Sequence, residues 1–156
     1  MLRGASFSAC RKHRYALWRI WDEGLPLVTF IGLNPSDADE TKDDPTIRRI
    51  IGFAKSWGYG GAYVVNLFDQ ISSDPKTVAI HLAGELNEEI LLQYTLKSEL
   101  VILAWGSDKI AEARALQVLH LLPAHHIPAF CLGINKNGSP KHPLYVRGDS
   151  RPSAYY

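Results

Sequence analysis

Side chains that can bind a ligand or a cation follow the apolar segments of this chain. Asn34 comes directly after the apolar run 27–33, and acidic residues crowd the segment 37–44 behind it. Hard divalent cations prefer carboxylates gathered in this way, although a solvated acidic loop has the same composition. Asp44 also has a structural interpretation, because it stands before Pro45 as the N-cap of a predicted helix.

His142 is the histidine best suited to act as a positioned hydrogen-bond donor. It stands between Lys141 and Pro143 in a segment rich in proline and glycine, where helix packing does not account for it. Two prolines within a short span restrict the backbone, as the positioning of a catalytic side chain requires. An ordinary surface histidine in the same loop is the alternative interpretation.

Four polar segments, each after a predicted strand, are expected to meet at one edge of a sheet: 34–37, 66–69, 105–108 and 135–145. Right-handed crossovers bring the carboxyl ends of parallel strands, and the loops that follow them, to the same edge. Four such strand ends together predict a shared pocket, although Asn34 or Asn66 alone is explained equally well as a partner for backbone groups at a strand end. The further candidates for ligand binding are Pro35, Ser36, Asp37, Asp43, Asn66, Phe68, Trp105, Gly106, Lys136, Gly138, Pro143 and Tyr145.

The elements that must position these residues predict an α/β fold. Strands are expected over 14–21, 27–33, 62–68, 100–104 and 127–132, and helices from Pro45 to a stop at Gly58, over 86–97 and over 108–122, with a short helical turn at Asp74-Pro75. The turn 23–26 is expected to fold the first of these strands back antiparallel onto the second. The predicted fold is a three-layer α/β sandwich, with a short, mostly parallel sheet between helices and an N-terminal antiparallel strand. A single domain is expected over residues 1–156.

Composition limits the function only weakly. A net charge of +1 makes no case for nucleic acid, although the first 21 residues hold five basic residues and no acidic one. The two cysteines have no metal-ligand spacing, no apolar stretch reaches the length of a membrane span, and the N-terminus has no signal-peptide pattern. A cytoplasmic protein that does not bind or span a membrane is therefore expected, and the oligomeric state is left open.

The polar segments, taken together, resemble a known family. They read Leu33-Asn-Pro-Ser-x-Ala-Asp39, Asp43-Asp-Pro-Thr46, Asn66-Leu-Phe68, Trp105-Gly106 and Gly138-x-Pro-x-His-Pro-Leu-Tyr145, in this order over nearly the whole chain. This combination is similar to the bacterial and phage family called domain of unknown function 1643. That resemblance supplies a family without implying a reaction.

A more distant resemblance implies a chemistry. Gly32-Leu-Asn-Pro35, after the first long apolar strand, is similar to the first motif of the uracil-DNA glycosylase superfamily. In the mismatch-specific branch of that superfamily, the asparagine of this motif positions the attacking water. His142-Pro143 is similar to the second motif, a loop that contacts the departing base and the DNA minor groove. The resemblance implies a short parallel sheet between helices, in agreement with the fold predicted above.

The same resemblance implies roles for individual side chains. Asn34 would position the water, and His142 would stabilise the charge that builds on the departing base. The other roles would fall to Asn66 as the base-reading residue, to Asp37, Asp43 or Asp44 as the stabiliser of a cationic sugar, and to Trp105 or Phe68 as the aromatic that stacks on an extruded base.

Three functional hypotheses follow. The first is a protein that binds a nucleobase, a nucleotide or nucleic acid and cleaves an N-glycosidic bond, without a metal or cofactor, as a DNA or nucleoside N-glycosylase does. The second is a divalent-metal-dependent phosphohydrolase or nuclease that uses Asp37, Asp39 and Asp43. The third is a non-catalytic nucleic-acid-binding module, whose phosphate contacts would come from the basic residues Arg11, Lys12, Arg14 and Arg19.

Overall fold

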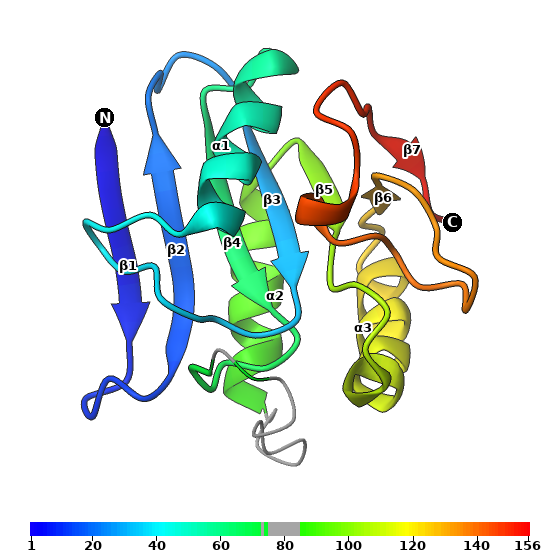
Figure 1. Cartoon of the computed structure of the whole chain (residues 1–156). Helices are drawn as coiled ribbons and strands as arrows, with labels where there is room; N and C mark the ends of the chain where they lie inside the picture. Colours follow the sequence, from blue (N-terminus) through cyan, green and yellow to red (C-terminus); the bar gives the residue numbers. More distant parts are fainter. Residues whose placement is uncertain (73, 75–84) are drawn as a thin grey trace.

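One mixed sheet organises the computed structural model of this chain, which describes residues 1–72, 74 and 85–156. Its strands are β1 Leu2–Phe7, β2 Arg14–Ile20, β3 Leu27–Gly32, β4 Gly61–Asn66, β5 Leu100–Leu103, β6 Phe130–Cys131 and β7 Ser153–Ala154. They lie in the order β1-β2-β4-β3-β5-β6-β7, as Figure 1 shows. The four strands β3 to β6 are parallel to one another, whereas β1–β2, β2–β4 and β6–β7 pair antiparallel.

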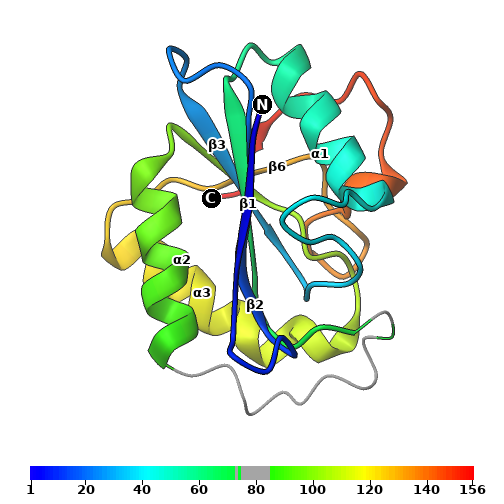
Figure 2. The same ribbon diagram turned by 90° about the vertical axis from the view of Figure 1, so that its left-hand side faces the viewer.

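Helices cover both faces of this sheet. They are α1 Pro45–Ser56, α2 Glu85–Lys97 and α3 Glu112–Ala124, with the short 3-10 turns η3 Lys109–Ala111 and η4 Pro143–Tyr145. α1 lies on one face and α2 and α3 lie on the other, which is plain when the sheet is seen edge-on in Figure 2. The fold is therefore the three-layer α/β sandwich that the alternation of strands and helices predicts. Within the described ranges, no helix has the length and apolar character to cross a membrane.

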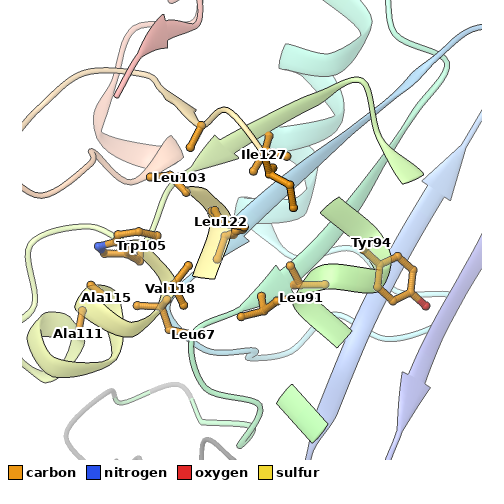
Figure 3. Close-up of a cluster of buried hydrophobic side chains, with 14 of the residues drawn as sticks. Leu67, Leu91, Tyr94, Leu103, Trp105, Ala111, Ala115, Val118, Leu122 and Ile127 are labelled. Carbon is orange, nitrogen blue, oxygen red and sulfur yellow. The ribbon is translucent and has the colours of Figure 1, made fainter. Parts of the chain in front are cut away.

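Each face of the sheet has its own hydrophobic core. Because side chains alternate along a strand, neighbouring residues of β3 point to opposite cores. Phe30 packs toward α1 with Ile50 and Phe53, whereas Ile31 packs toward α2 and α3. Figure 3 shows the second core, in which Leu91 of α2 and Val118 of α3 approach the sheet. The strands are thereby held from both sides up to the residues at which they end.

The predicted hairpin between the strands 14–21 and 27–33 is wrong. β2 pairs with β4 instead, with Leu17 opposite Val64, so that β4 lies between β2 and β3. The physical reason is burial, because β4 is almost entirely buried and needs a neighbouring strand on each side. Because β2 is antiparallel to the parallel strands, its first residue, Arg14, lies at the edge of the sheet where those strands end.

The remaining differences from prediction are at the ends of elements. The predicted helix 108–122 begins as η3, with Asp108 as its N-cap, and continues as α3. The last predicted strand shortens to the two residues of β6, and the edge strands β1 and β7 are not predicted at all. Pro75 and the residues after it in the turn expected at Asp74-Pro75 lie outside the described ranges.

Candidate functional site

A cavity of about 500 Å³ opens at the carboxyl edge of the sheet. All four of the polar segments identified in the sequence contribute to its wall, together with the first residue of β2 and the first turns of α1. Of the predicted site residues, the wall contains Asn34, Pro35, Ser36, Asp44, Asn66, Trp105, Gly106, His142, Pro143 and Tyr145. The wall does not contain Asp37, Asp43, Phe68, Lys136 or Gly138.

Asn34 follows β3 and is held by its amide nitrogen. Nδ2 donates to the backbone oxygen of Ser72 at 2.8 Å, to that of Pro35 at 3.1 Å and, more weakly, to that of Gln70 at 3.4 Å. These three carbonyl oxygens decide which end of the amide is the nitrogen, since they can only accept. Asn34 Oδ1 has no hydrogen bond within the described part of the chain. It is therefore the end of the side chain that can accept from a water or a ligand.

Asn66 ends β4 beside the glycine of the first motif. Its side chain is 5% exposed, and a Cβ at Gly32 would lie 2.7 Å from Asn66 Oδ1. Glycine at position 32 therefore makes room for the amide. Asn66 Nδ2 is buried and has no hydrogen-bond partner among the described residues. The wall thus holds an unpaired donor, which is rare for a buried amide.

Asp44 both caps α1 and lines the cavity wall. Its Oδ1 accepts from the backbone N–H of Ile47 at 2.9 Å, which is the N-cap predicted from the sequence. Its Oδ2 accepts from Ser36 Oγ at 3.0 Å, and the residue is 7% exposed. The start of α1 therefore fixes a carboxylate in the cavity wall.

His142 is held by the turn that it begins. Its Nδ1 accepts from the backbone N–H of Leu144 at 3.1 Å, so the neutral ring carries its proton on Nε2. Burial lowers the pKa of His142 below its ordinary value, against a smaller opposing effect of the Asp44 charge. Arg49 of α1 holds the turn by donating to the backbone oxygens of Pro143 and Val146. At neutral pH the ring is therefore a positioned donor.

Arg14 lies in the cavity wall, whereas the sequence suggested it only as a phosphate contact on a basic surface. It begins β2, is 3% exposed, and donates from Nη1 to the backbone oxygen of Ala38 at 3.1 Å. Its Nε is buried and finds no acceptor among the described residues. Burial lowers the pKa of Arg14 to about 10, so the guanidinium remains charged at neutral pH. The signal was available in principle, because an antiparallel strand starts at the edge where the parallel strands end.

The acidic loop forms internal contacts. Asp39 Oδ1 accepts from the backbone N–H groups of Thr41 and Lys42, which lower its pKa, while Asp37 is exposed. Asp43 binds the guanidinium groups of Arg19 and Arg3. The described residues contain no group of three or more His, Cys, Asp or Glu side chains arranged to hold a metal ion. The predicted cation site of Asp37, Asp39 and Asp43 is therefore not assembled, because two of its carboxylates are used inside the fold.

The predicted stacking aromatics are core residues. Phe68 is fully buried away from the cavity, and Trp105 touches the cavity wall but packs into the core beside Ala111 and Ala115 (Figure 3). The aromatic side chain that reaches solvent at this cavity is that of Tyr145, which is 80% exposed, with its ring centroid 5.5 Å from that of His142. Tyr145 is therefore the better placed residue for stacking.

The structure places two further sets of predicted residues differently from what the sequence suggests. Lys136 and Gly138 are exposed in the loop before η4, and Gly138 lines a smaller neighbouring cavity instead. Among the basic residues expected to contact phosphates, Arg14 and Arg19 are buried, and Arg11 is paired with Glu40 at 2.6 Å. Arg14 and Arg19 therefore do not belong to an exposed basic surface, whereas Arg11 and Lys12 are exposed.

Comparisons with known proteins identify a family. The family model described as "Protein of unknown function (DUF1643)" matches residues 14–144, which is most of the chain and includes every wall residue discussed except Tyr145. No curated protein and no solved structure matches the chain.

Proposed function

This chain belongs to the DUF1643 family, and we propose that it binds a nucleobase or nucleotide and hydrolyses an N-glycosidic bond. One observation carries the proposal: Asn34, Asn66, Asp44 and His142 share the wall of a single cavity. A cavity of about 500 Å³ is within the range of small-molecule sites. The similarity of the Gly32–Pro35 and His142-Pro143 motifs to the uracil-DNA glycosylase superfamily adds support.

The state of each side chain suits this reaction. Asn34 Oδ1 is an available acceptor, so it can orient a water through one of the water's protons. His142 Nε2–H is an available donor. A neutral imidazole can stabilise negative charge on a departing base by donating this hydrogen bond. The Asp44 carboxylate can stabilise positive charge on a sugar.

The proposed reaction is a hydrolysis. The bond between C1′ of the sugar and the base nitrogen breaks, and its electron pair leaves with the base. The oxygen of the water held by Asn34 forms the new bond to C1′, and one water proton balances the charge of the released base. The transition state resembles an oxocarbenium ion, which places its positive charge near Asp44 and its negative charge near His142.

The test is release of free base from a panel of nucleosides, nucleoside 5′-monophosphates and single-stranded DNA, followed by chromatography. We expect release from at least one member of the panel, and a loss of about 10²–10³-fold in rate for Asn34→Ala and for His142→Asn. His120→Asn, on the exposed side of α3, is the matched control and should retain the wild-type rate. Absence of base release from every substrate, or equal rates for the variants and the wild type, would refute the proposal.

A further inference from the structure

We propose that the cavity recognises an anionic oxygen of its ligand, and that Arg14 Nε and Asn66 Nδ2 donate to it. The two atoms are the buried side-chain donors that have no hydrogen-bond partner among the described residues, and both belong to residues of the same cavity wall. This inference rests on the proposed function for the identity of the ligand as a nucleobase or nucleotide. It adds the charge of the group that is bound and a binding residue, Arg14, that the superfamily motifs do not include.

The fold places the two donors at one edge of the sheet. Arg14 begins β2 and Asn66 ends β4, and these neighbouring strands pair antiparallel. The backbone N–H of Arg14 donates to the backbone oxygen of Asp69, three residues beyond Asn66. The two side chains therefore reach the cavity from adjacent strands and can bind one group together.

Arg14 forms no ion pair with a described residue. Asp44 is the nearby carboxylate that acts on its charge, but both Asp44 oxygens already accept hydrogen bonds, from Ile47 and Ser36. Arg19, the other charge acting on Arg14, is a cation and is bound to Asp43. A buried guanidinium with an unpaired N–H favours a ligand that brings negative charge and an acceptor together.

A nucleotide carries this chemistry in two places. One is the phosphate, and the other is a carbonyl oxygen of the base, which gains negative charge as the electron pair of the glycosidic bond passes to the departing base. In the first case Arg14 contributes to binding of the ground state. In the second it contributes in the transition state, where a charge-assisted hydrogen bond strengthens as the charge grows.

The experiment combines calorimetric titration and turnover for the wild type, Arg14→Gln and Arg14→Lys. The probes are a nucleoside, its 5′-monophosphate, the free base and inorganic phosphate. A phosphate bound at Arg14 predicts that the wild type binds the monophosphate at least 10-fold more tightly than the nucleoside, and that Arg14→Gln abolishes this preference. A base oxygen bound at Arg14 predicts similar affinities for both, with kcat at least 10-fold lower in Arg14→Gln and nucleoside affinity unchanged.

Arg11→Gln is the matched control, because Arg11 lies three residues away in an exposed ion pair with Glu40 and should behave as wild type in both measurements. The charge preference of the wild type tests the phosphate arm even if the Arg14 variants fold poorly. Equal affinity for nucleoside and monophosphate, combined with unchanged kcat in a folded Arg14 variant, would overturn the inference alone. Monophosphate preference without base release would instead support the inference and refute the proposed hydrolysis, while no binding of any probe would overturn both.

Discussion

Asn66 can lie in the cavity wall because residue 32 has no side chain. A Cβ at Gly32 would approach Asn66 Oδ1 to 2.7 Å, so Gly32→Ala must displace the amide. We expect nucleotide affinity to fall by about 10-fold or more, since a displaced donor loses a hydrogen bond to the ligand. Titration calorimetry measures this change.

The control for this prediction is a second glycine. Gly52 lies on the exposed side of α1, and a Cβ there would meet no atom within 4 Å. Gly52→Ala should leave ligand affinity unchanged and stabilise the protein by about 0.5–1 kcal/mol, because alanine loses less conformational entropy in a helix. Equal affinities for Gly32→Ala and Gly52→Ala would contradict the role given to Asn66.

His142 makes stability depend on pH in a defined direction. Burial lowers its folded-state pKa below the ordinary 6.5, so the unfolded chain takes up a proton at this residue before the folded chain does. This contribution to stability is present above pH 6.5 and is lost as the pH falls through 6.5 toward the folded pKa. The wild type should therefore lose more Tm than His142→Asn between pH 7.5 and 5.5.

Asparagine is the suitable replacement because its side-chain oxygen can still accept from the Leu144 N–H but does not titrate. Thermal unfolding monitored by circular dichroism at several pH values gives the comparison. Parallel pH profiles for the two proteins would show that the His142 pKa is not lowered in the folded state.

At the start of α1, one residue, Asp44, provides both the helix cap and a carboxylate in the cavity wall. Asp44→Asn retains a capping side chain and removes the charge, whereas Asp44→Ala removes both. We expect Asp44→Ala to lose about 1 kcal/mol of stability, or about 2–4 °C in Tm, and Asp44→Asn to lose much less. Both variants should lose most of the hydrolytic rate.

Thermal unfolding and base release, measured on the same preparations, separate the two roles. A fully active Asp44→Asn would confine Asp44 to the structural role. A fully inactive Asp44→Asn with wild-type stability would support the placement of positive charge beside this carboxylate.

The acidic loop is joined to the sheet through Arg19. Its guanidinium binds the Asp43 carboxylate and the backbone oxygens of Asp39 and Lys42 while it is almost completely buried. Arg19→Met should cost about 3–5 kcal/mol, since it leaves two carbonyls without their donor and leaves the Asp43 carboxylate with only the more exposed Arg3 as its partner. Urea denaturation measures this loss, and Arg11→Met in the exposed pair with Glu40 should change stability little. Comparable losses for the two variants would contradict the structural role of Arg19.

For the molecule as a whole, local sequence patterns predict the helices and strands better than they predict which strands pair. The apolar runs of β3, β4 and β5 and the Asp44-Pro45 start of α1 could be read from the sequence, because burial and capping leave local signatures. The position of β4 between β2 and β3 could not, because pairing between distant segments depends on the burial of the whole sheet. The edge strands β1 and β7 are mostly exposed or half-buried, so they lack the apolar pattern that marks a buried strand.

The candidate site, too, was predictable from the sequence only in part. The strand-end residues Asn34 and Asn66 and the loop residue His142 were predictable, because parallel strands must end at one edge. Arg14 was expected only on a basic surface and not in the cavity wall, since its side chain resembles a surface residue until the antiparallel placement of β2 is known. Phe68 was assigned to the ligand because its type suits stacking, but its neighbours bury it completely.

A crystal structure of the protein soaked with a nucleoside 5′-monophosphate tests the proposed nucleotide binding most directly. We expect the nucleotide in the cavity at the carboxyl edge of the sheet, with the base or sugar within hydrogen-bond distance of Asn34, Asn66 or His142 and an anionic oxygen on Arg14. Nucleotide bound at another surface, or a cavity that remains without nucleotide at saturating concentration, would contradict this proposal.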